Sequence, residues 1–341
     1  MPLTALRGVA ALWVVALHLA GNLDLSGFVS LSGGLLRNML RGGELAVDVF
    51  FVLSGYVLAL TWREGQPVVA FWIRRVGRIF PLHLVVLAGM AVGVWAMLRM
   101  GVQTRDLSFF DFRVLPEHAT LTFIWLGLPI GWNAPTWSLS VEFAGYLLFP
   151  LAMAAFLRMP ARWLPGLTGL LAVATALVVH IFDLPHEGPQ ALLRGFLGIA
   201  TGAALRLGGI GPLARAPGAC ALAIIVLLAL DLPGPAVLPI VGLVAGLALP
   251  EATPTGRILA HSAAAWLGKV SYSVYLLHAP LLIVFLQVLR RLPVLHSPVG
   301  LAVFTAIYLA VLMLAAEIAW RVVEKPGIRA ARSLAGRVAQ R

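Results

Sequence analysis

Three ionisable side chains stand inside long apolar stretches of this sequence. His18 ends the stretch LRGVAALWVVALH, Asp48 lies in GELAVDVFFVLSGYVLAL, and Glu142 lies in WSLSVEFAGYLLFP. Such groups are costly to bury and must face the protein interior or a water-filled cavity. We predict that Asp48 hydrogen-bonds His18 and fixes its tautomer, which would make the imidazole a general base. Alternatively, His18 only bonds a neighbouring helix, and Asp48 forms a structural ion pair with Arg7 or Arg41.

Arginines form a second group of candidates. Arg7 and His18 are eleven residues apart, a spacing that puts them on one helical face about 16 Å apart along the axis. In FWIRRVGRIFPLHL, Arg75 precedes Arg78 by three residues and Arg74 precedes it by four. Each of these pairs can share one face of a helix. Clustered guanidinium groups suit phosphate oxygens, such as those of a nucleotide-bearing acyl carrier. The alternative is a plain topology signal beside a membrane helix.

A third group of polar and aromatic side chains could contact a substrate. Trp137 and Ser138 precede Glu142, and helical spacing aligns Ser138 with Glu142. Tyr275 and His278 share a helical face in GKVSYSVYLLHAPLL. The many polar side chains of this segment indicate that this face is turned into the protein. We predict that this group lines an acceptor pocket. The alternative for Ser138 and Glu142 is a cap at the start of a helix.

The composition is that of a membrane protein. Of 341 residues, 60% are hydrophobic and 11% are charged, against about a quarter charged in soluble domains. Lys and Arg outnumber Asp and Glu by 25 to 14, but most of them stand in short links between apolar runs or in the tail. There they fix orientation and contact anionic headgroups, so we expect no nucleic-acid partner. The single cysteine, Cys220, excludes an intramolecular disulfide and a thiolate metal cluster.

Apolar runs recur along the whole chain and predict an all-α, polytopic bundle of about ten membrane-spanning helices. If both termini are cytoplasmic, the basic links satisfy the positive-inside rule only when residues 118–157 cross the membrane once. The short piece 118–136, which ends in the helix-breaking series GWNAP, is therefore expected to be re-entrant or interfacial, or the broken first half of that crossing. The spans are predicted near 4–21, 44–62, 79–98, 137–157, 165–182, 190–206, 217–231, 235–250, 266–289 and 299–321.

Five segments, in the right order over nearly the whole chain, resemble the acyltransferase-3 superfamily of bacterial membrane O-acyltransferases. They are LRGVAALWVVALH, GGELAVDVFFVLSGYVL, FWIRRVGRIFPLHL, PTWSLSVEFAGYLLFP and LGKVSYSVYLLHAPL, and a closing VVEKPGIR with Glu324 and Pro326 resembles the family's usual end. A departure is His83, where relatives often have tyrosine. The resemblance implies an enzyme that moves an acyl group, commonly acetyl, from cytoplasmic acyl-CoA to a hydroxyl of a sugar or another acceptor.

The resemblance also implies roles, a location and a domain. His18 takes the catalytic role, and Arg7 joins Arg74, Arg75 and Arg78 in meeting the donor's phosphates. The location is the bacterial cytoplasmic membrane, with both termini cytoplasmic. Residues 1–325 are expected to form a single transmembrane acyltransferase domain and 326–341 a basic cytoplasmic tail, without the extracytoplasmic hydrolase-like domain of some relatives.

We hypothesise that His18, oriented by Asp48, is the general base of a direct transfer that needs no metal. An acyl-enzyme on His18, Ser54 or another residue is an alternative. Two other classes of protein compete with this reading. One is a transporter whose path is lined by Arg7, Asp48 and Glu142; the other is an intramembrane serine protease using Ser54 and His278, which Val52 disfavours because that position would want glycine.

Overall fold

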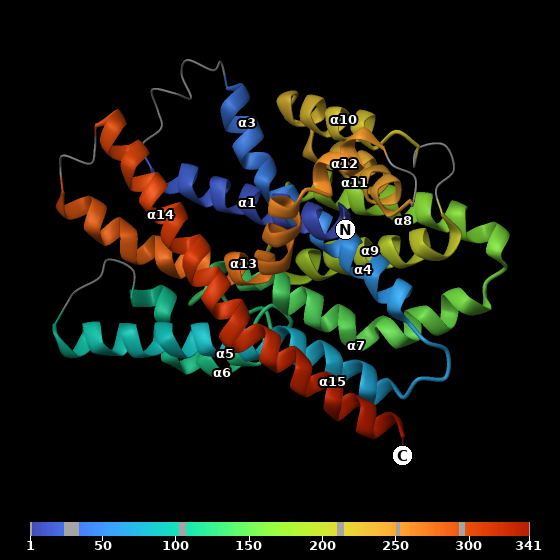
Figure 1. The fold of residues 1–341 in the computed structure, drawn as a ribbon, viewed down its shortest axis with the longest axis horizontal. Helices are drawn as coiled ribbons and strands as arrows, with labels where there is room; N and C mark the ends of the chain where they lie inside the picture. Colours follow the sequence, from blue (N-terminus) through green and yellow to red (C-terminus); the bar gives the residue numbers. More distant parts are fainter. Residues whose placement is uncertain are drawn as a thin grey trace. The chain divides into compact units, whose positions relative to one another are not determined.

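The computed structural model describes residues 2–23, 34–101, 107–209, 215–249, 253–292 and 297–340. The regular elements in these ranges are all helices, which confirms the all-α prediction (Figure 1). Residue 250, in the eighth predicted span, and residue 341, in the predicted tail, lie outside them. The chain divides into two compact units, and helices α7 (Trp137–Arg158) and α13 (Ser262–Arg291) run from one unit into the other. The units are Met1–Glu64 with Val141–Lys269, and Gly65–Ser140 with Val270–Arg341.

The described helices fall on the ten predicted spans. Eight helical stretches are long and apolar enough to cross a membrane, and α10 (Pro217–Ala229) and α11 (Pro233–Ala248) are shorter apolar helices at the seventh and eighth predicted spans. The chain is therefore a multi-pass membrane protein. The eight stretches are Pro2–Asn22, Leu35–Thr61, Val68–Arg99, Ala134–Arg158, Ala161–Ile181, Gly188–Gly208, Ser262–Leu289 and Pro298–Ala339.

Small residues let the helices of the first unit approach one another closely. A Cβ added at Gly55 of α4 (Ala46–Thr61) would collide with the carbonyl oxygen of Ile199, and one added at Gly202 of α9 (Gly188–Gly208) would collide with that of Val52. Close contact through small residues is a common way for membrane helices to associate, since van der Waals packing replaces the hydrophobic driving force. Gly55 is thus a close-packing residue between α4 and α9.

The first helix is held in the same way. In α1 (Pro2–Asn22), a Cβ at Gly8 would lie 2.7 Å from the backbone nitrogen of Gly268 in α13. A Cβ at Gly268 would in turn meet the backbone of Thr4. The remaining helices of this unit are α3 (Leu35–Arg41), α8 (Leu164–Ile181) and α12 (Pro254–Leu259).

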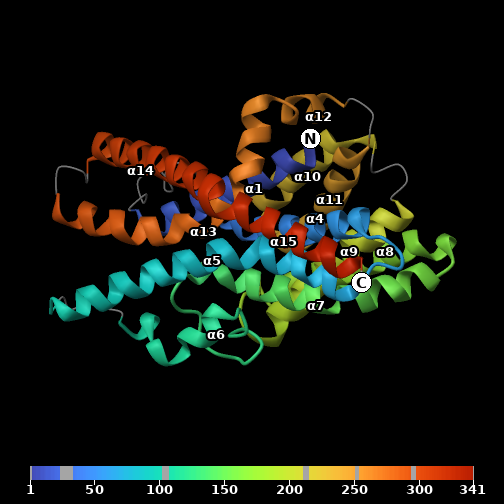
Figure 2. The ribbon, with the colours of Figure 1, turned by 60° about the horizontal axis from the view of Figure 1, so that its bottom comes forward.

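The second unit joins α5 (Val68–Arg99) to the C-terminal helices. α14 (Pro298–Ala319) continues through a π-helical turn, Trp320–Glu324, into α15 (Lys325–Ala339). α15 packs along α5, as Figures 1 and 2 both show. Gly77 of α5 lies against Ala331, and Gly327 lies against Pro81. The segment predicted as a basic tail is thus a helix over the residues described, fastened to the third span.

The piece 118–136 is largely non-helical. After α6 (Leu115–Ala119), the chain makes turns until a short 3₁₀ helix, Ala134–Thr136, leads into α7. The indole of Trp125 donates to the carbonyl oxygen of Ser140 at 2.9 Å, and the Ser140 hydroxyl donates to that of Leu121 at 2.6 Å. Such side-chain bonds satisfy backbone groups that a helix would pair internally. This segment does not span as a helix, in agreement with the count of one crossing for 118–157.

Candidate active site

His18 lies near the end of α1 and is half-buried. Its Nδ1 lies 2.8 Å from the carbonyl oxygen of Val14, one turn earlier. Because a carbonyl oxygen only accepts, Nδ1 carries the proton in the neutral ring, and Nε2 is then the basic nitrogen. The imidazole therefore has the tautomer that a general base requires, and the α1 backbone fixes it.

Asp48 does not hydrogen-bond His18, so that part of the prediction is wrong. Both carboxylate oxygens of Asp48 are taken by Arg194 of α9, with Nε to Oδ1 at 3.0 Å and Nη2 to Oδ2 at 2.6 Å. Both side chains are completely buried. Arg194 also donates to the carbonyl oxygens of Pro185 and Glu44. A guanidinium buried at this depth needs a carboxylate that accepts two parallel hydrogen bonds from it. It binds that carboxylate more strongly than an imidazole would.

Glu142 forms a hydroxyl–carboxylate cluster with Ser54 and Tyr146. Its Oε1 accepts from the Ser54 hydroxyl at 2.6 Å and from the Tyr146 hydroxyl at 2.6 Å. Glu142 itself is half-buried. This cluster can orient a hydroxyl group or accept a proton from one, since a carboxylate binds O–H donors strongly.

Arg78 is tied to the C-terminal end of the chain. Its guanidinium pairs with Oε1 of Glu324, the last residue of the π-helical turn, and Oε2 of Glu324 accepts from the Ser273 hydroxyl at 2.8 Å. Glu324 is 1% exposed. The guanidinium also lies 5.1 Å from the ring centre of Tyr272, in cation–π range. Arg78 is thus largely neutralised within the second unit.

The other predicted donor-binding arginines have different surroundings. Arg74 donates to the side chain of Gln66. Arg75 lies over the ring of Phe71 at 5.5 Å. Arg7 is half-buried on α1, three residues after the Thr4 backbone that meets Gly268. Arg78 differs from these surroundings in its pairing with the buried carboxylate of Glu324.

Three of the four predicted acceptor residues lie together. The Ser138 and Tyr275 hydroxyls are 2.7 Å apart, and Tyr275 donates to the carbonyl oxygen of Pro135 at 2.8 Å. Nδ1 of His278 donates to the Tyr275 carbonyl oxygen at 2.6 Å. All three side chains are buried. They fasten the start of α7 to α13 in the second unit, and Trp137, the half-buried first residue of α7, extends from this joint.

Several side chains of these clusters were not assigned from the sequence. Arg194 lies within the predicted span 190–206, and a lone arginine in an apolar run already demands a buried acid. Tyr146 follows Glu142 by four residues, a spacing that permits a contact. The Ser273 contact with Glu324 spans 51 residues, and no local pattern could have revealed it.

Comparisons with known proteins identify the family of the chain. The model of the family described as "Acyltransferase domain" matches residues 3–316. Acyltransferase MdmB of Streptomyces mycarofaciens is 38% identical over 163 residues, which are 47% of this chain and 41% of that protein. The exopolysaccharide production protein ExoZ of Rhizobium meliloti is 32% identical over 257 residues, 69% of this chain and 75% of that protein.

A third relative is the peptidoglycan O-acetyltransferase OatA of Listeria monocytogenes, 28% identical over 170 residues, 46% of this chain and 27% of that protein. The matched regions thus cover less than half of MdmB and of OatA. No solved structure matches the chain. Because the family model extends over nearly all ten predicted spans, from the helix of His18 to the last, the chain belongs to the acyltransferase-3 family.

Proposed function

We propose that this enzyme transfers an acetyl or other short acyl group from cytoplasmic acyl-CoA to a hydroxyl of a carbohydrate or another hydroxylated acceptor. The names of two relatives support a glycan, since OatA is a peptidoglycan O-acetyltransferase and ExoZ is an exopolysaccharide production protein. The proposed location is the bacterial cytoplasmic membrane, with both termini in the cytoplasm, because that orientation satisfies the positive-inside rule.

The observation that carries the chemistry is the 2.8 Å contact of His18 Nδ1 with the carbonyl oxygen of Val14. Because that oxygen only accepts, the contact assigns the proton to Nδ1 and leaves Nε2 as the base. In the proposed step, Nε2 takes the proton of the acceptor hydroxyl as its oxygen attacks the thioester carbonyl carbon. The carbon–sulfur bond then breaks, and the CoA sulfur leaves with the proton from the imidazolium. The products are the acyl ester and free CoA.

The donor's phosphates are proposed to contact Arg7, Arg74 and Arg75. Guanidinium groups bind phosphate oxygens through pairs of N–H donors. Arg78 belongs to the same sequence cluster, but the Glu324 carboxylate already satisfies much of its charge. We therefore assign Arg78 mainly to holding the end of the chain against α5, which positions its neighbours Arg74 and Arg75.

The acceptor is proposed to lie beside Glu142 and Trp137. The Glu142 carboxylate can accept a bond from a sugar hydroxyl, and an aromatic ring suits the apolar face of a sugar. Ser138, Tyr275 and His278 are bonded to one another and to nearby carbonyl oxygens, so they would act by holding Trp137 in position. Asp48, completely buried with Arg194, would act by positioning α4 rather than by touching a substrate.

The test compares His18→Ala with His180→Gln, a matched control on an exposed histidine of α8. Cells that lack the gene are complemented with each variant, and the masses of surface glycans and secreted small molecules are measured. We expect the control to restore a product that gains one acyl mass and His18→Ala to yield none while remaining in the membrane. Product formation by His18→Ala would refute the base, and no mass gain with the wild type would refute the acceptor class.

The donor is tested separately with membranes that contain the wild-type protein. Release of free thiol from acetyl-CoA should depend on an added extract of the acceptor-bearing cells. Membranes with the empty vector serve as the control. Equal thiol release in both would exclude acetyl-CoA as donor, and the assay is then repeated with longer acyl-CoA species.

A further inference from the structure

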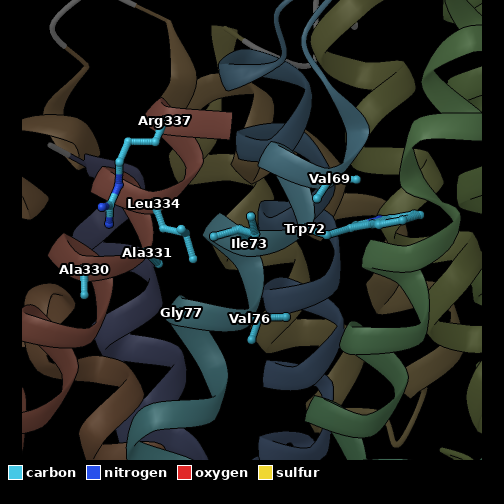
Figure 3. Close-up of a pocket in the computed structure, with 9 residues that line it drawn as sticks. All are labelled: Val69, Trp72, Ile73, Val76, Gly77, Ala330, Ala331, Leu334 and Arg337. Atoms are coloured by element: carbon cyan, nitrogen blue, oxygen red, sulfur yellow. The ribbon is translucent and has the colours of Figure 1, made fainter. Parts of the chain in front are cut away.

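An apolar groove runs between the first part of α5 and α15, both within the second unit. Its volume is about 510 Å³, and eight of its nine lining residues are apolar or glycine, the ninth being Arg337. Ile73 and Leu334 point toward one another across it (Figure 3). Val69 is 53% exposed and Leu334 is 45% exposed. The groove is therefore open, and these apolar side chains are left for something else to cover.

The groove lies on the side of α5 opposite to the arginine cluster. Successive residues of a helix are turned by about 100° around its axis. The five α5 residues that line the groove therefore face, on average, about 180° away from the mean direction of Arg74, Arg75 and Arg78. The phosphates of a donor bound by that cluster would lie on the other side of the helix. The groove is consequently separate from that proposed donor contact. The five α5 residues are Val69, Trp72, Ile73, Val76 and Gly77.

Helix lengths place this groove outside the hydrocarbon core, on the side of the lipid headgroups. The 22 residues of α14 span about 33 Å, enough to fill a hydrocarbon core of about 30 Å. α15, which continues that helix, must then lie beyond the core. The 32 residues of α5 span about 48 Å, so its first part also extends past the core.

The charge of α15 identifies the class of occupant. Residues 325–341 contain no Asp or Glu and five basic residues, Lys325, Arg329, Arg332, Arg337 and Arg341. Basic residues at the membrane surface attract anionic lipids. From these observations we infer that the groove binds one anionic phospholipid, with an acyl chain between Ile73 and Leu334 and the phosphate on Arg337. The lipid would fasten α15 to α5.

The test uses phosphatidylglycerol with a photoreactive group on one acyl chain, added to the purified full-length protein in detergent. After irradiation, we expect the lipid on peptides that contain Ile73 and Leu334. Arg337→Gln should weaken labelling by about fivefold relative to wild type, the effect of one basic residue near a lipid surface. Arg332→Gln removes the same charge from an exposed residue of α15 outside the groove and should leave labelling nearly unchanged.

Ala330→Trp supplies a second, independent measurement. Ala330 lines the groove but is exposed, so the larger side chain would fill the groove without entering the contact between Gly77 and Ala331. We expect labelling of the two peptides to fall severalfold while thermal unfolding is unchanged.

Three outcomes would each overturn the inference. They are equal labelling in Arg337→Gln and Arg332→Gln, equal labelling with neutral phosphatidylcholine, and labelling confined to other peptides. If Ala330→Trp is unstable, the two arginine variants decide.

Discussion

Asp48 and Arg194 form a completely buried ion pair between α4 and α9, in which the guanidinium takes both carboxylate oxygens. The same two helices meet backbone to backbone at Gly55 and Gly202. The pair is thus part of a tight helix–helix contact. Its loss is expected to affect the fold before it affects the chemistry.

Removing one partner of this pair should be strongly destabilising. Asp48→Asn leaves a buried guanidinium without its charge partner, a change that costs about 3–5 kcal/mol. Thermal unfolding of the purified protein should therefore occur at a clearly lower temperature, and Asp48→Leu with Arg194→Met should recover much of the loss. If Asp48→Asn instead keeps its stability and shifts the acidic limb of the pH–rate profile, Asp48 acts on the base and the structural assignment is wrong.

Glu142 should matter through its charge. Glu142→Gln retains an oxygen that can accept from Ser54 and Tyr146 but removes the negative charge. We expect the KM for the acceptor to rise about tenfold, because a hydrogen bond to a charged group is worth about 1.5–3 kcal/mol. Unchanged acceptor kinetics in this variant would remove Glu142 from the site.

Ser54→Ala separates direct transfer from an acyl-enzyme on that hydroxyl. Direct transfer with His18 as base predicts that most turnover survives, since the Ser54 hydroxyl then only bonds Glu142 and Tyr146. The measurement is single-turnover incubation with radiolabelled acetyl-CoA in the absence of acceptor, followed by acid quenching. Label retained on the wild-type protein and lost in Ser54→Ala would establish the covalent route instead.

The arginine cluster should divide into two functions. Arg75→Gln should raise the KM for the acyl donor about tenfold, the cost of one charge-assisted contact to phosphate, with little effect on unfolding. Arg78→Gln should chiefly lower the unfolding temperature, because it leaves the buried carboxylate of Glu324 without its cation. A donor KM that rises equally in both variants, at unchanged stability, would return Arg78 to the donor site.

His118 predicts an acid-sensitive stability. Burial lowers the pKa of its imidazole from 6.5 to about 4, and the ring is 1% exposed and stacked on Phe123. Between these values the unfolded chain binds more protons, so stability should decrease as the pH falls from 6.5 to 4, by at most about 3 kcal/mol. Unfolding temperatures measured over this range should vary less in His118→Gln, and an equal slope in both proteins would contradict the assignment.

Much of the fold could be predicted from the sequence, because a membrane-spanning helix is a long local signal. The ten apolar runs and the single crossing of 118–157 both agree with the described helices. Side-chain pairing was harder, since it depends on which helix faces which. Asp48 had several possible partners, and the one that the fold supplies stands 146 residues away. The helical structure of 325–339 was also missed, because its basic residues suggested a solvated tail.

The π-helical turn at Trp320–Glu324 sets the rotational phase of α15, that is, which of its faces is turned toward α5. A π turn holds more residues than an α turn, so deleting one residue from it would rotate α15 by about 100° relative to α14. Ala331 would leave Gly77, and the acid at position 324 would swing away from Arg78. The number of residues in this turn therefore sets the contacts of α15, whereas a single substitution at the exposed Val322 leaves that phase intact.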